Sequence, residues 1–365
     1  MKIVHLVDTM EMGGAEKLVA QLCRHQRQEG LEASVHCLYR VGILGEELRA
    51  EGFEVVLHRP SWPAGRPGSI YHKLRRSKPD VVHCHNAAAT ILGAIPARLA
   101  GAKGVVATRH GIVSAPHSLR RELKFAFASR SCNWIVAVCE QARSNLMAAP
   151  FAARRKIVRI YNATLEPRCN GANRPLKSGF ALLHVARLCP AKDQETLLRA
   201  FAQAKDRVPD LQLWIVGGGI LRRQLETLAS QIGLNGSVTF FGEQVDVAPF
   251  FVEADLYVLS SITEGVPVSL LEALAVGLPA VVTDVGGMSE IARLSGATVA
   301  VPASNVAALA VAIEKMANSR DELPRLREIA RQCHLANFTL ERMANEYMAL
   351  YNNTHPPRDN RNLSS

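Results

Sequence analysis

The sequence is short of several features that would each point to a class of protein. Aromatic residues make up 5% of its 365 residues and no basic motif is interleaved with aromatics, which disfavours a nucleic-acid-binding module. A membrane-spanning helix needs about 18 apolar residues in a row, and the longest apolar run, residues 87–97, is interrupted by Thr90 and Pro96. Asp8 stands where a signal peptide would keep an apolar core. We therefore expect a soluble protein without a secretion signal.

Cysteine is present but shows no motif. The eight cysteines include no C-x-x-C pair, and no cysteine and histidine residues have the spacing of a zinc site. Disulfide frameworks belong to short, cysteine-dense extracellular chains, which this chain is not. We expect buried, reduced thiols in a cytoplasmic protein that requires no metal and no cofactor.

Charge is unevenly distributed. The net charge is +10, but residues 1–165 hold 24 Lys and Arg against 12 Asp and Glu, whereas residues 166–365 hold 19 against 21. A basic first half favours an anionic partner, either nucleic acid, a membrane surface or a phosphorylated substrate. A basic surface that only aids solubility is the alternative, and charge alone does not decide between them.

Short β-branched apolar runs alternate with amphipathic stretches along the whole chain, which is typical of βαβ units with a parallel sheet. In the first half the expected strands are residues 2–7, 33–38, 54–57, 81–84, 104–108 and 134–138. In the second half they are residues 181–186, 211–216, 238–241, 256–259 and 280–283. The fold class predicted is α/β, with two doubly wound, Rossmann-like parallel-sheet domains.

Residues 162–179 are rich in Pro, Gly and Asn and are expected to form a linker between the domains. We expect an N-terminal domain at residues 1–165 and a C-terminal domain at residues 166–337. A last amphipathic segment, residues 338–351, is expected to pack back on the first domain, and residues 352–365 to form a disordered tail. Ligands bind such sheets at the carboxyl ends of the strands, so we expect the site in a cleft between the domains.

Two glutamates, Glu264 and Glu272, are separated by seven residues in the segment SSITEGVPVSLLEALAVGLPAVVTDVGGMSE, residues 260–290. Glu264 follows an expected strand, and Glu272 lies within an expected helix at residues 269–276. Backbone amides at the start of such a helix form an anion site, and a carboxylate suits vicinal sugar hydroxyls. The alternative is structural, with Glu264 as a helix cap and Glu272 as a solvated helix residue.

Two further loops also follow expected strands. In VARLCPAKD, residues 185–193, Arg187 and Lys192 could clamp a diphosphate. In DTMEMGGAE, residues 8–16, Gly13 and Gly14 allow the backbone to approach a phosphate closely. Each motif has a simpler alternative, solvated cations in the first and an ordinary glycine turn in the second.

Together these motifs resemble those of the family 4 glycosyltransferases, which have the GT-B architecture and retain anomeric configuration. The resemblance covers nearly the whole chain. It includes GGAE at residues 13–16, VARLxxxK at 185–192, the E-x7-E with its trailing GxP and GG at 264–287, and FTLERMANEYMALY at 338–351. The E-x7-E with its flanks is the specific motif among these.

The resemblance implies that a nucleotide-diphosphate sugar is held mainly by the second domain. The family residues matching Arg187 and Lys192 neutralise the donor diphosphate. The residue matching Glu264 contacts the transferred sugar, and the one matching Glu272 holds the ribose hydroxyls. Gly14, in the first domain, would approach the diphosphate across the cleft.

Further donor contacts are implied by the same resemblance. Those along the sugar and phosphates match Gly265, Val266 and the amides near Val268 and Ser269. A glycine turn beside the nucleotide matches Gly217 and Gly218, and there the chain departs from the family's frequent Gly-x-Gly-Pro because Ile220 replaces the proline.

A histidine near the transferred sugar is common in the family, and His110, at the end of an expected strand, is the candidate for that role. A lone histidine at such a place is about as often structural. His83 and His85, in VVHCHN, end another expected strand and are assigned to the acceptor side. We expect these two to point in alternate directions, so that at most one faces the cleft.

The implied reaction is sugar transfer from a UDP-sugar, with a hexose or N-acetylhexosamine as the sugar. The acceptor would be a glycan, a lipid-linked glycan or another hydroxyl compound in surface polysaccharide or glycolipid synthesis. Cations and helix-start amides would stabilise the leaving diphosphate without metal. His110, Glu264, Arg187 and Lys192 are therefore the candidate catalytic residues, and no nucleophile is assigned.

Other functions stay open. A GT-B relative could instead be a sugar-nucleotide epimerase or a phosphorylase. A nicotinamide dehydrogenase shares the fold class, but its G-x-G-x-x-G fingerprint is missing. A nucleic-acid binder would explain only the basic charge.

Residues 118–130, SLRRELKFAFASR, place Leu119, Leu123 and Phe127 at steps of four beside four cations. Such a helix suits an anionic bilayer, and we expect a protein that associates reversibly with the inner face of the membrane. The alternative is that this apolar face packs on the sheet.

Overall fold

The computed structural model describes residues 1–60, 65–111, 119–149, 153–167 and 177–354. The chain divides into two compact units, residues 1–162 with 340–365, and residues 163–339. Each unit is an α/β layer structure around its own parallel sheet, as the fold class predicted. Half of the expected linker, residues 168–176, and all but the first residues of the expected tail lie outside the described residues.

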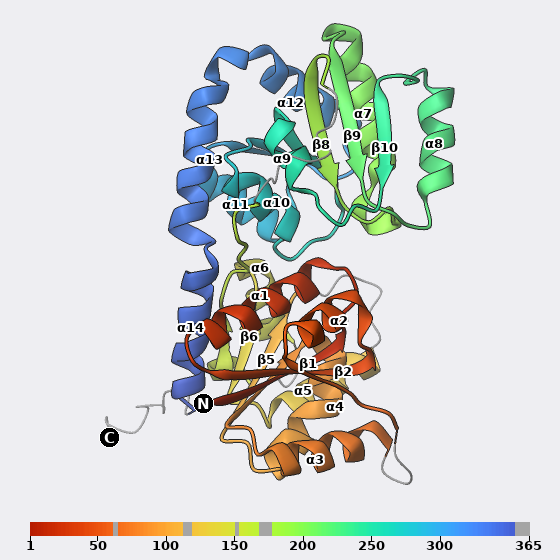
Figure 1. Ribbon diagram of the computed structural model, residues 1–365. Coiled ribbons are helices and arrows are strands. Elements are labelled where there is room, and N and C mark those ends of the chain that lie inside the picture. The colour runs from red at the N-terminus through yellow and green to blue at the C-terminus, as the bar shows by residue number, and fades with distance from the viewer. Residues whose placement is uncertain (61–64, 112–118, 150–152, 168–176, 355–365) are drawn as a thin grey trace. The chain divides into compact units, whose positions relative to one another are not determined.

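In the first unit the described residues form a seven-stranded parallel sheet in the order β3-β2-β1-β4-β5-β6-β7 (Figure 1). Its strands are β1 (Lys2–Thr9), β2 (Glu32–Arg40), β3 (Glu54–Leu57), β4 (Val81–His85), β5 (Gly104–Arg109), β6 (Trp134–Ala137) and β7 (Ile157–Arg159). Its helices are α1 (Gly14–Gln28), α2 (Gly42–Ala50), α3 (Gly65–Ser77), α4 (Asn86–Leu99), α5 (Leu119–Ser129), α6 (Glu140–Ala148) and α14 (Leu340–Asn352).

In the second unit the described residues form a six-stranded parallel sheet in the order β10-β9-β8-β11-β12-β13. Its strands are β8 (Phe180–Val185), β9 (Leu211–Val216), β10 (Val238–Gly242), β11 (Leu256–Leu259), β12 (Ala280–Thr283) and β13 (Thr298–Val301). Its helices are α7 (Gln194–Arg207), α8 (Arg222–Gln231), α9 (Ala248–Glu253), α10 (Val268–Ala275), α11 (Gly287–Ser295), α12 (Val306–Asn318) and α13 (Leu323–Asn337).

The strand order reverses between β1 and β4 in one sheet and between β8 and β11 in the other. Loops at such a reversal diverge to opposite faces, which leaves a crevice at the carboxyl ends of the strands. The central strands are covered on both faces, and every residue of β11 is fully buried. This rigid centre holds the loops that follow β1 and β4 in the first unit and β8 and β11 in the second.

The structure differs from the sequence expectations mainly at the edges. The two outer strands β7 and β13 were not expected; an edge strand has a single partner and a short, weakly alternating pattern. The boundary between the two units falls between residues 162 and 163, within the expected linker. Asn162, Ala163 and Thr164 are buried there, and Thr164 bridges to Thr339.

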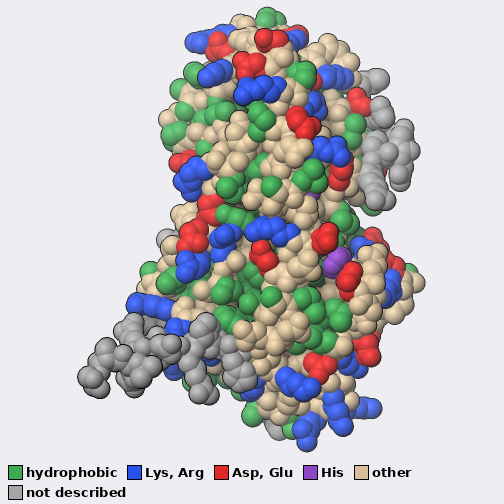
Figure 2. All heavy atoms as spheres, turned by 90° about the vertical axis from the view of Figure 1, so that its left-hand side faces the viewer, with side chains coloured by type: hydrophobic (Ala, Val, Ile, Leu, Met, Phe, Trp, Pro, Cys, Tyr) green, Lys and Arg blue, Asp and Glu red, His purple; other side chains and the backbone are tan. Residues whose placement is uncertain are grey.

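Charges on the second unit are mixed in sign. In the upper part of Figure 2, which is that unit, basic and acidic side chains are interspersed, in keeping with its nearly balanced composition. Seven of the cysteines lie in the described residues, all as free thiols, and Cys189 alone among these seven is partly exposed.

Candidate functional site

The loop between β8 and the start of α7 carries the predicted diphosphate clamp. Three hydrogen bonds hold this loop. The Leu188 amide donates to the Gly218 carbonyl at 2.7 Å, the Ile262 amide donates to the Ala191 carbonyl at 3.0 Å, and the Ser260 hydroxyl donates to the Lys192 carbonyl at 2.9 Å. These bonds join the loop to the segments after β9 and β11, so three predicted motifs meet at one edge of the sheet.

The Gln194 side chain also holds this loop in place. Its side-chain amide donates to the Arg187 carbonyl at 3.0 Å and lies 3.3 Å from Nε2 of His184, whose Nδ1 lies 2.9 Å from the Val258 carbonyl. Burial lowers the pKa of His184 to about 4, with the Val258 hydrogen bond opposing, so this imidazole is neutral. Gln194 is a positioning residue that sequence reasoning missed; its only signal was a polar residue at the start of a helix.

The glycine turn after β9 has a structural reason for its composition. At Gly217, φ is +136° and an added Cβ would lie 2.1 Å from the Ala186 carbonyl oxygen; at Gly219, φ is +151° and the Cβ would lie 2.3 Å from that of Leu188. A side chain at either position would push against the clamp loop. At Gly218 the three atoms nearest to an added Cβ all belong to the Glu243 side chain. Ile220 is largely exposed.

Lys192 and Glu264, predicted to bind the diphosphate and the sugar, form an ion pair in the structure. Both are partly buried, with side chains 22% and 12% exposed, and the Ser261 hydroxyl donates to the same Glu264 oxygen at 2.8 Å. Arg187, on the same loop as Lys192, is exposed. In the free protein, therefore, the positive charge of Lys192 is already compensated.

The segment after β11 holds the remaining residues predicted to contact the donor. Gly265 and Val266 are buried in the turn, and the Gly287 amide donates to the Gly265 carbonyl at 2.7 Å. Helix α10 then begins at Val268, and its first turn holds Ser269, whose hydroxyl lies 2.7 Å from that of Tyr257.

Glu272 lies one turn further along α10 than Val268. Burial raises the pKa of Tyr257, and the charges of both Glu264 and Glu272 act on its hydroxyl in the same direction. Both carboxylate charges therefore act on the Tyr257 hydroxyl, which contacts Ser269 in the first turn of α10, where the first backbone amides of the helix have no helical acceptor.

The first unit holds Gly13, Gly14 and His110. Gly13 precedes α1 with an extended backbone, and Gly14 is the first residue of that helix, directly after β1. His110 follows β5, and its amide lies 3.2 Å from Oδ1 of Asn86 at the start of α4. These loops share the carboxyl edge of one sheet, as predicted for the first-domain part of the site.

His83 and His85 differ from the sequence expectation. Residues two apart on a strand point to the same face, so the expected alternation was wrong. Their rings lie 4.0 Å apart between centroids, and both side chains are buried. Nδ1 of His83 lies 2.7 Å from the Tyr351 hydroxyl and its Nε2 lies 2.8 Å from Oγ1 of Thr108. His83 is thus enclosed beneath α14 and does not line an open acceptor surface.

Helix α5 turns its apolar stripe outward. Leu119, Leu123 and Phe127 are 65%, 41% and 64% exposed, so the alternative that this face packs on the sheet is wrong. The helix is held instead by buried Phe125 and by Glu122, whose carboxylate accepts a hydrogen bond from Arg109 at 2.7 Å. Ser118, the first residue of the expected helix, lies outside the described residues.

No helix within the described residues is long and apolar enough to span a lipid bilayer.

Comparison with known proteins agrees with this architecture. Residues 12–164 match the model of Glycosyltransferase Family 4, and residues 172–333 match that of Glycosyl transferases group 1. EpsD of Bacillus subtilis, which carries a glycosyltransferase name, is 26% identical over 306 residues, covering 77% of this chain and 80% of EpsD. The UDP-Gal:alpha-D-GlcNAc-diphosphoundecaprenol alpha-1,3-galactosyltransferase of Escherichia coli is 28% identical over 238 residues, covering 60% of this chain and 61% of the relative.

Among solved structures, Anabaena HepE in complex with UDP is similar with a TM-score of 0.83 at 19% identity, covering 96% of this chain and 99% of HepE. That likeness concerns the fold, which is the GT-B fold predicted. With both halves of the chain matched by family models, and with the predicted donor motifs at one sheet edge of the second unit, the chain belongs to the family 4 glycosyltransferases and is a glycosyltransferase.

Proposed function

We propose that this glycosyltransferase moves a hexose or N-acetylhexosamine from a UDP-sugar to a glycan or lipid-linked acceptor, with retention of configuration, in surface polysaccharide synthesis. The observation that carries the proposal is the ion pair of Lys192 and Glu264, which joins the loop that carries Arg187 to the segment that leads into α10. UDP is favoured because HepE was crystallised with UDP-glucose and the Escherichia coli relative is named for a UDP-galactose donor.

The charges of this site suit the departure of a nucleoside diphosphate. Breaking the bond to the sugar builds negative charge on the diphosphate oxygen, and Arg187, Lys192 and the first amides of α10 would meet it. Two fixed cations and a helix start supply the charge that a metal ion supplies in other transferases. We therefore propose that transfer needs no metal.

The donor is tested first by binding. Purified protein is heated with UDP, GDP, CDP and ADP, and the nucleotide that raises Tm most identifies the base; saturation at 100 times the Kd adds about 2.7 kcal/mol of stability. The matching nucleotide sugars are then supplied with lipid-linked and soluble glycan acceptors, with and without EDTA. Product anomers are read by NMR. A protein stabilised by none of the nucleotides, or a product of inverted configuration, would contradict the proposal.

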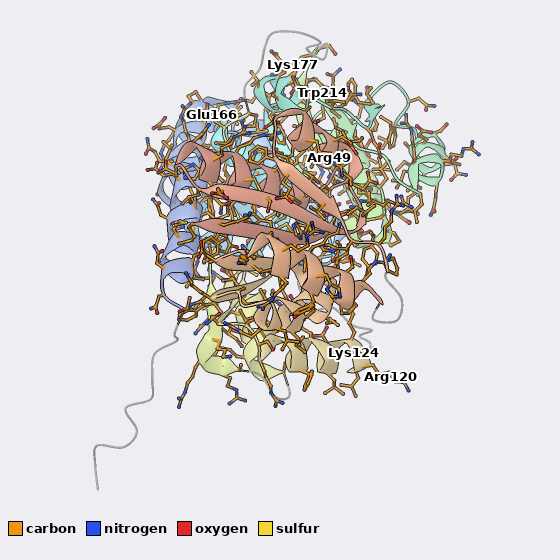
Figure 3. All side chains as sticks on the ribbon, turned by 60° about the horizontal axis from the view of Figure 1, so that its bottom comes forward. Arg49, Arg120, Lys124, Glu166, Lys177 and Trp214 are labelled. Carbon is orange, nitrogen blue, oxygen red and sulfur yellow. The ribbon has the colours of Figure 1, made fainter. Side chains whose placement is uncertain are left out.

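The acceptor side is proposed to work at an anionic membrane surface through α5. Its exposed Leu119, Leu123 and Phe127 stand among cations, and Figure 3 shows Arg120 and Lys124 at the outer edge of the first unit. Neither of these two cations forms an ion pair with another described residue. Each basic residue near an anionic bilayer contributes about 1 kcal/mol, so apolar insertion and charge act together.

Sedimentation with vesicles tests this surface. Binding should require anionic lipid and fall as salt rises, because exposed charges are screened within about 10 Å at 0.1 M salt. The double variant Arg120→Glu with Lys124→Glu should lose binding, whereas Arg75→Glu, the same change on exposed α3, should keep most of it. Equal binding to neutral vesicles, or none to anionic ones at low salt, would rule out the membrane role.

A further inference from the structure

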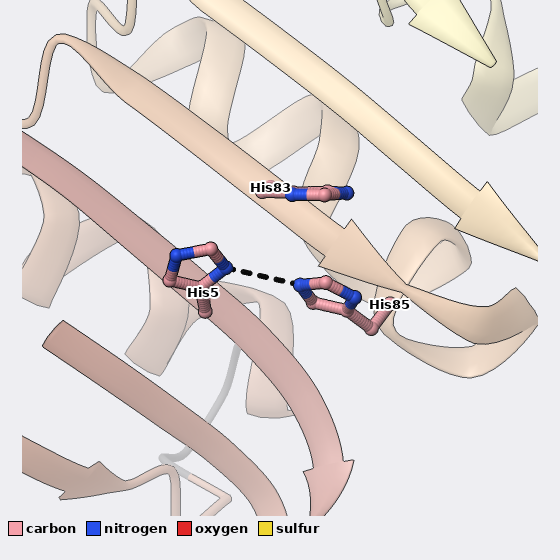
Figure 4. A group of neighbouring side chains, drawn as sticks. All are labelled: His5, His83 and His85. Carbon is pink, nitrogen blue, oxygen red and sulfur yellow. Dashed lines mark hydrogen bonds between the residues drawn. The ribbon is translucent and has the colours of Figure 1, made fainter. Parts of the chain in front are cut away.

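Three histidines of the first unit form one hydrogen-bonded row that ends at an amide side chain on each side. Nε2 of His5 lies 2.8 Å from Oε1 of Gln26, and Nδ1 of His5 lies 3.0 Å from Nε2 of His85. Nδ1 of His85 lies 3.0 Å from Nε2 of His110, and Nδ1 of His110 lies 3.2 Å from Oδ1 of Asn162. Figure 4 shows the central bond, between His5 on β1 and His85 at the end of β4. The row runs from the buried face of α1 to the predicted sugar-side histidine.

The row has a definite proton count. Its four links each need one hydrogen, and three neutral imidazoles carry one N–H apiece. Burial lowers the pKa of His5 and His110 to about 4 and that of His85 well below its usual value, so an extra proton is disfavoured at neutral pH. One of the two terminal amides must therefore donate through its NH2 while the other accepts through its oxygen.

Gln26 is the amide suited to donate. Its Nε2 is buried and has no hydrogen-bond partner within the described part of the chain, which is costly for a polar atom. A half-turn of the amide would place that NH2 on Nε2 of His5 and turn the oxygen away. The Tyr351 hydroxyl, a polar neighbour of Gln26, can then donate to this oxygen while accepting from His83. Every ring nitrogen of the row then has a matched partner, and the buried NH2 of Gln26 is no longer unpaired.

This direction sets the tautomer of every ring in the row. Because Gln26 donates to His5, the proton of His5 is on Nδ1 and points to His85. His85 likewise donates from Nδ1 to His110, and His110 donates from Nδ1 to Asn162. Of the three residues His110 is the most exposed, since His5 is fully buried and His85 is 2% exposed. The bond to Asn162 is the longest of the four and is the one that a substrate hydroxyl can replace.

We propose that His5 and His85 are positioning residues that hold His110 as a neutral Nδ1–H donor, so that His110 binds a sugar hydroxyl as a hydrogen-bond donor and does not act as a general base. The role in transfer rests on the proposed function; the tautomer does not. Nε2 of His110, the atom a base would use, is occupied by the N–H of His85.

A metal site is the competing interpretation of the same cluster. Ring nitrogens of His5, His83 and His85 lie within 4.8 Å of one another. Each of their ring nitrogens already has a hydrogen-bond partner, and none of these partners is a carboxylate. A dication there would be buried without compensating charge. Elemental analysis decides: one equivalent of zinc in the purified protein, held through dialysis, would overturn the hydrogen-bonded row.

The test uses two substitutions that each keep one of the two hydrogen bonds of the His85 ring. An asparagine amide mimics Nδ1, so His85→Asn keeps the donor to His110, whereas His85→Gln mimics Nε2 and keeps only the contact with His5. Nitrogen-15 NMR of the full chain should place the His110 proton on Nδ1 in the wild type and in His85→Asn. In His85→Gln it should move to Nε2 or become mixed. A wild-type proton on Nε2, or identical spectra in the two variants, would overturn the assignment.

A change at the far end provides a second test that leaves His85 and His110 intact. Gln26→Glu offers the row a carboxylate that only accepts, so the direction should reverse and the His110 proton should move to Nε2. An unchanged His110 spectrum in folded Gln26→Glu protein would refute the coupling.

Transfer is then measured on the same proteins. His85→Gln should lower kcat about 5- to 10-fold, the loss of one neutral hydrogen bond, and His85→Asn should restore it. If the tautomer responds as expected but kcat does not, the positioning role in transfer fails while the glycosyltransferase assignment stands. If no donor supports transfer by the wild type, the proposed function fails and the NMR result is unaffected.

Discussion

Glu264→Gln should tighten the binding of free UDP while it lowers transfer. In the free protein the Glu264 carboxylate compensates the charge of Lys192, and a diphosphate arriving at the clamp has to compete with that carboxylate. The glutamine has nearly the same shape and can still accept the Ser261 hydroxyl, but it carries no charge. Lys192 is then left free to bind the diphosphate.

The magnitude follows from the partial burial of the pair. Exposed ion pairs contribute about 0.2–1 kcal/mol, and hydrogen bonds to charged groups about 1.5–3 kcal/mol when shielded. With the two side chains 22% and 12% exposed, we take about 1 kcal/mol, which corresponds to a Kd for UDP about fivefold lower. Transfer should nonetheless fall about tenfold or more, because the carboxylate also contacts the transferred sugar in the proposed reaction.

Isothermal titration of UDP gives the Kd, and initial rates with the donor sugar give kcat. Glu195→Gln, the same change in an exposed ion pair on α7, should alter neither. Glu272→Gln should weaken UDP binding, because ribose contacts act equally in ground and transition states. The gain in Glu264→Gln should shrink at high salt. A Kd for UDP that is unchanged or higher in Glu264→Gln would refute the competition between the carboxylate and the diphosphate.

Three further predictions concern the clamp, the glycine turn and acid stability. Arg187→Ala and Lys192→Ala should each lower kcat about 100-fold or more without unfolding the protein. Arg199→Ala, which removes an exposed cation on α7, should leave kcat unchanged. A normal kcat in either clamp variant would exclude the diphosphate clamp. Gly217→Ala should lower the free energy of unfolding by about 2 kcal/mol or more, because the new Cβ meets a backbone carbonyl. Gly233→Ala, at φ +77° in open space, should lower it by about 1 kcal/mol, and urea unfolding measures both. His5, His110 and His184 have pKa values lowered to about 4, so each takes up a proton on unfolding between pH 6.5 and 4, and stability should fall as pH drops through that window. Between pH 7.5 and 5.5 the loss is about 1.4 kcal/mol per histidine; it should diminish in His184→Gln but not in His72→Gln, which changes an exposed histidine.

The fold could be predicted from the sequence because its central strands are continuous apolar runs, buried on both faces. β11, residues LYVL, is apolar throughout and is bounded on each side by polar residues, so its limits could be predicted without tertiary information. Edge strands such as β13 lack that signal, since Val299 and Ala300 face solvent within it.

Helix α5 shows the opposite case, in which a clear sequence pattern does not settle what the residues contact. Its stripe at Leu119, Leu123 and Phe127 has the spacing of a buried face, and only the structure shows that the stripe is exposed.

The site could be predicted in its residue types but not in its pairing. Lys192 and Glu264 belong to two motifs far apart in the sequence, and neither motif reveals that they compensate each other before a donor binds. Local patterns report which side chains follow a strand, whereas ion pairing depends on how two loops meet at the sheet edge. Ser261 and Gln194 were missed for the same reason, because each acts through a hydrogen bond to a residue of these loops, Glu264 and Arg187 respectively.

The histidine row explains why a polar layer can occupy the centre of the first sheet. His5, His83 and Thr108 point toward helices in positions where an apolar side chain would ordinarily pack, and each buried polar atom there needs a partner. Some partners come from far along the chain: Tyr351 meets His83, and Tyr347 lies 3.2 Å from the Thr108 hydroxyl. The closing helix α14 is thus tied to this unit by hydrogen bonds as well as by apolar contact. Truncating α14 would expose His83 and Thr108 to water and remove the Tyr351 hydroxyl beside Gln26, so we expect the truncation to weaken the proposed constraint on His110.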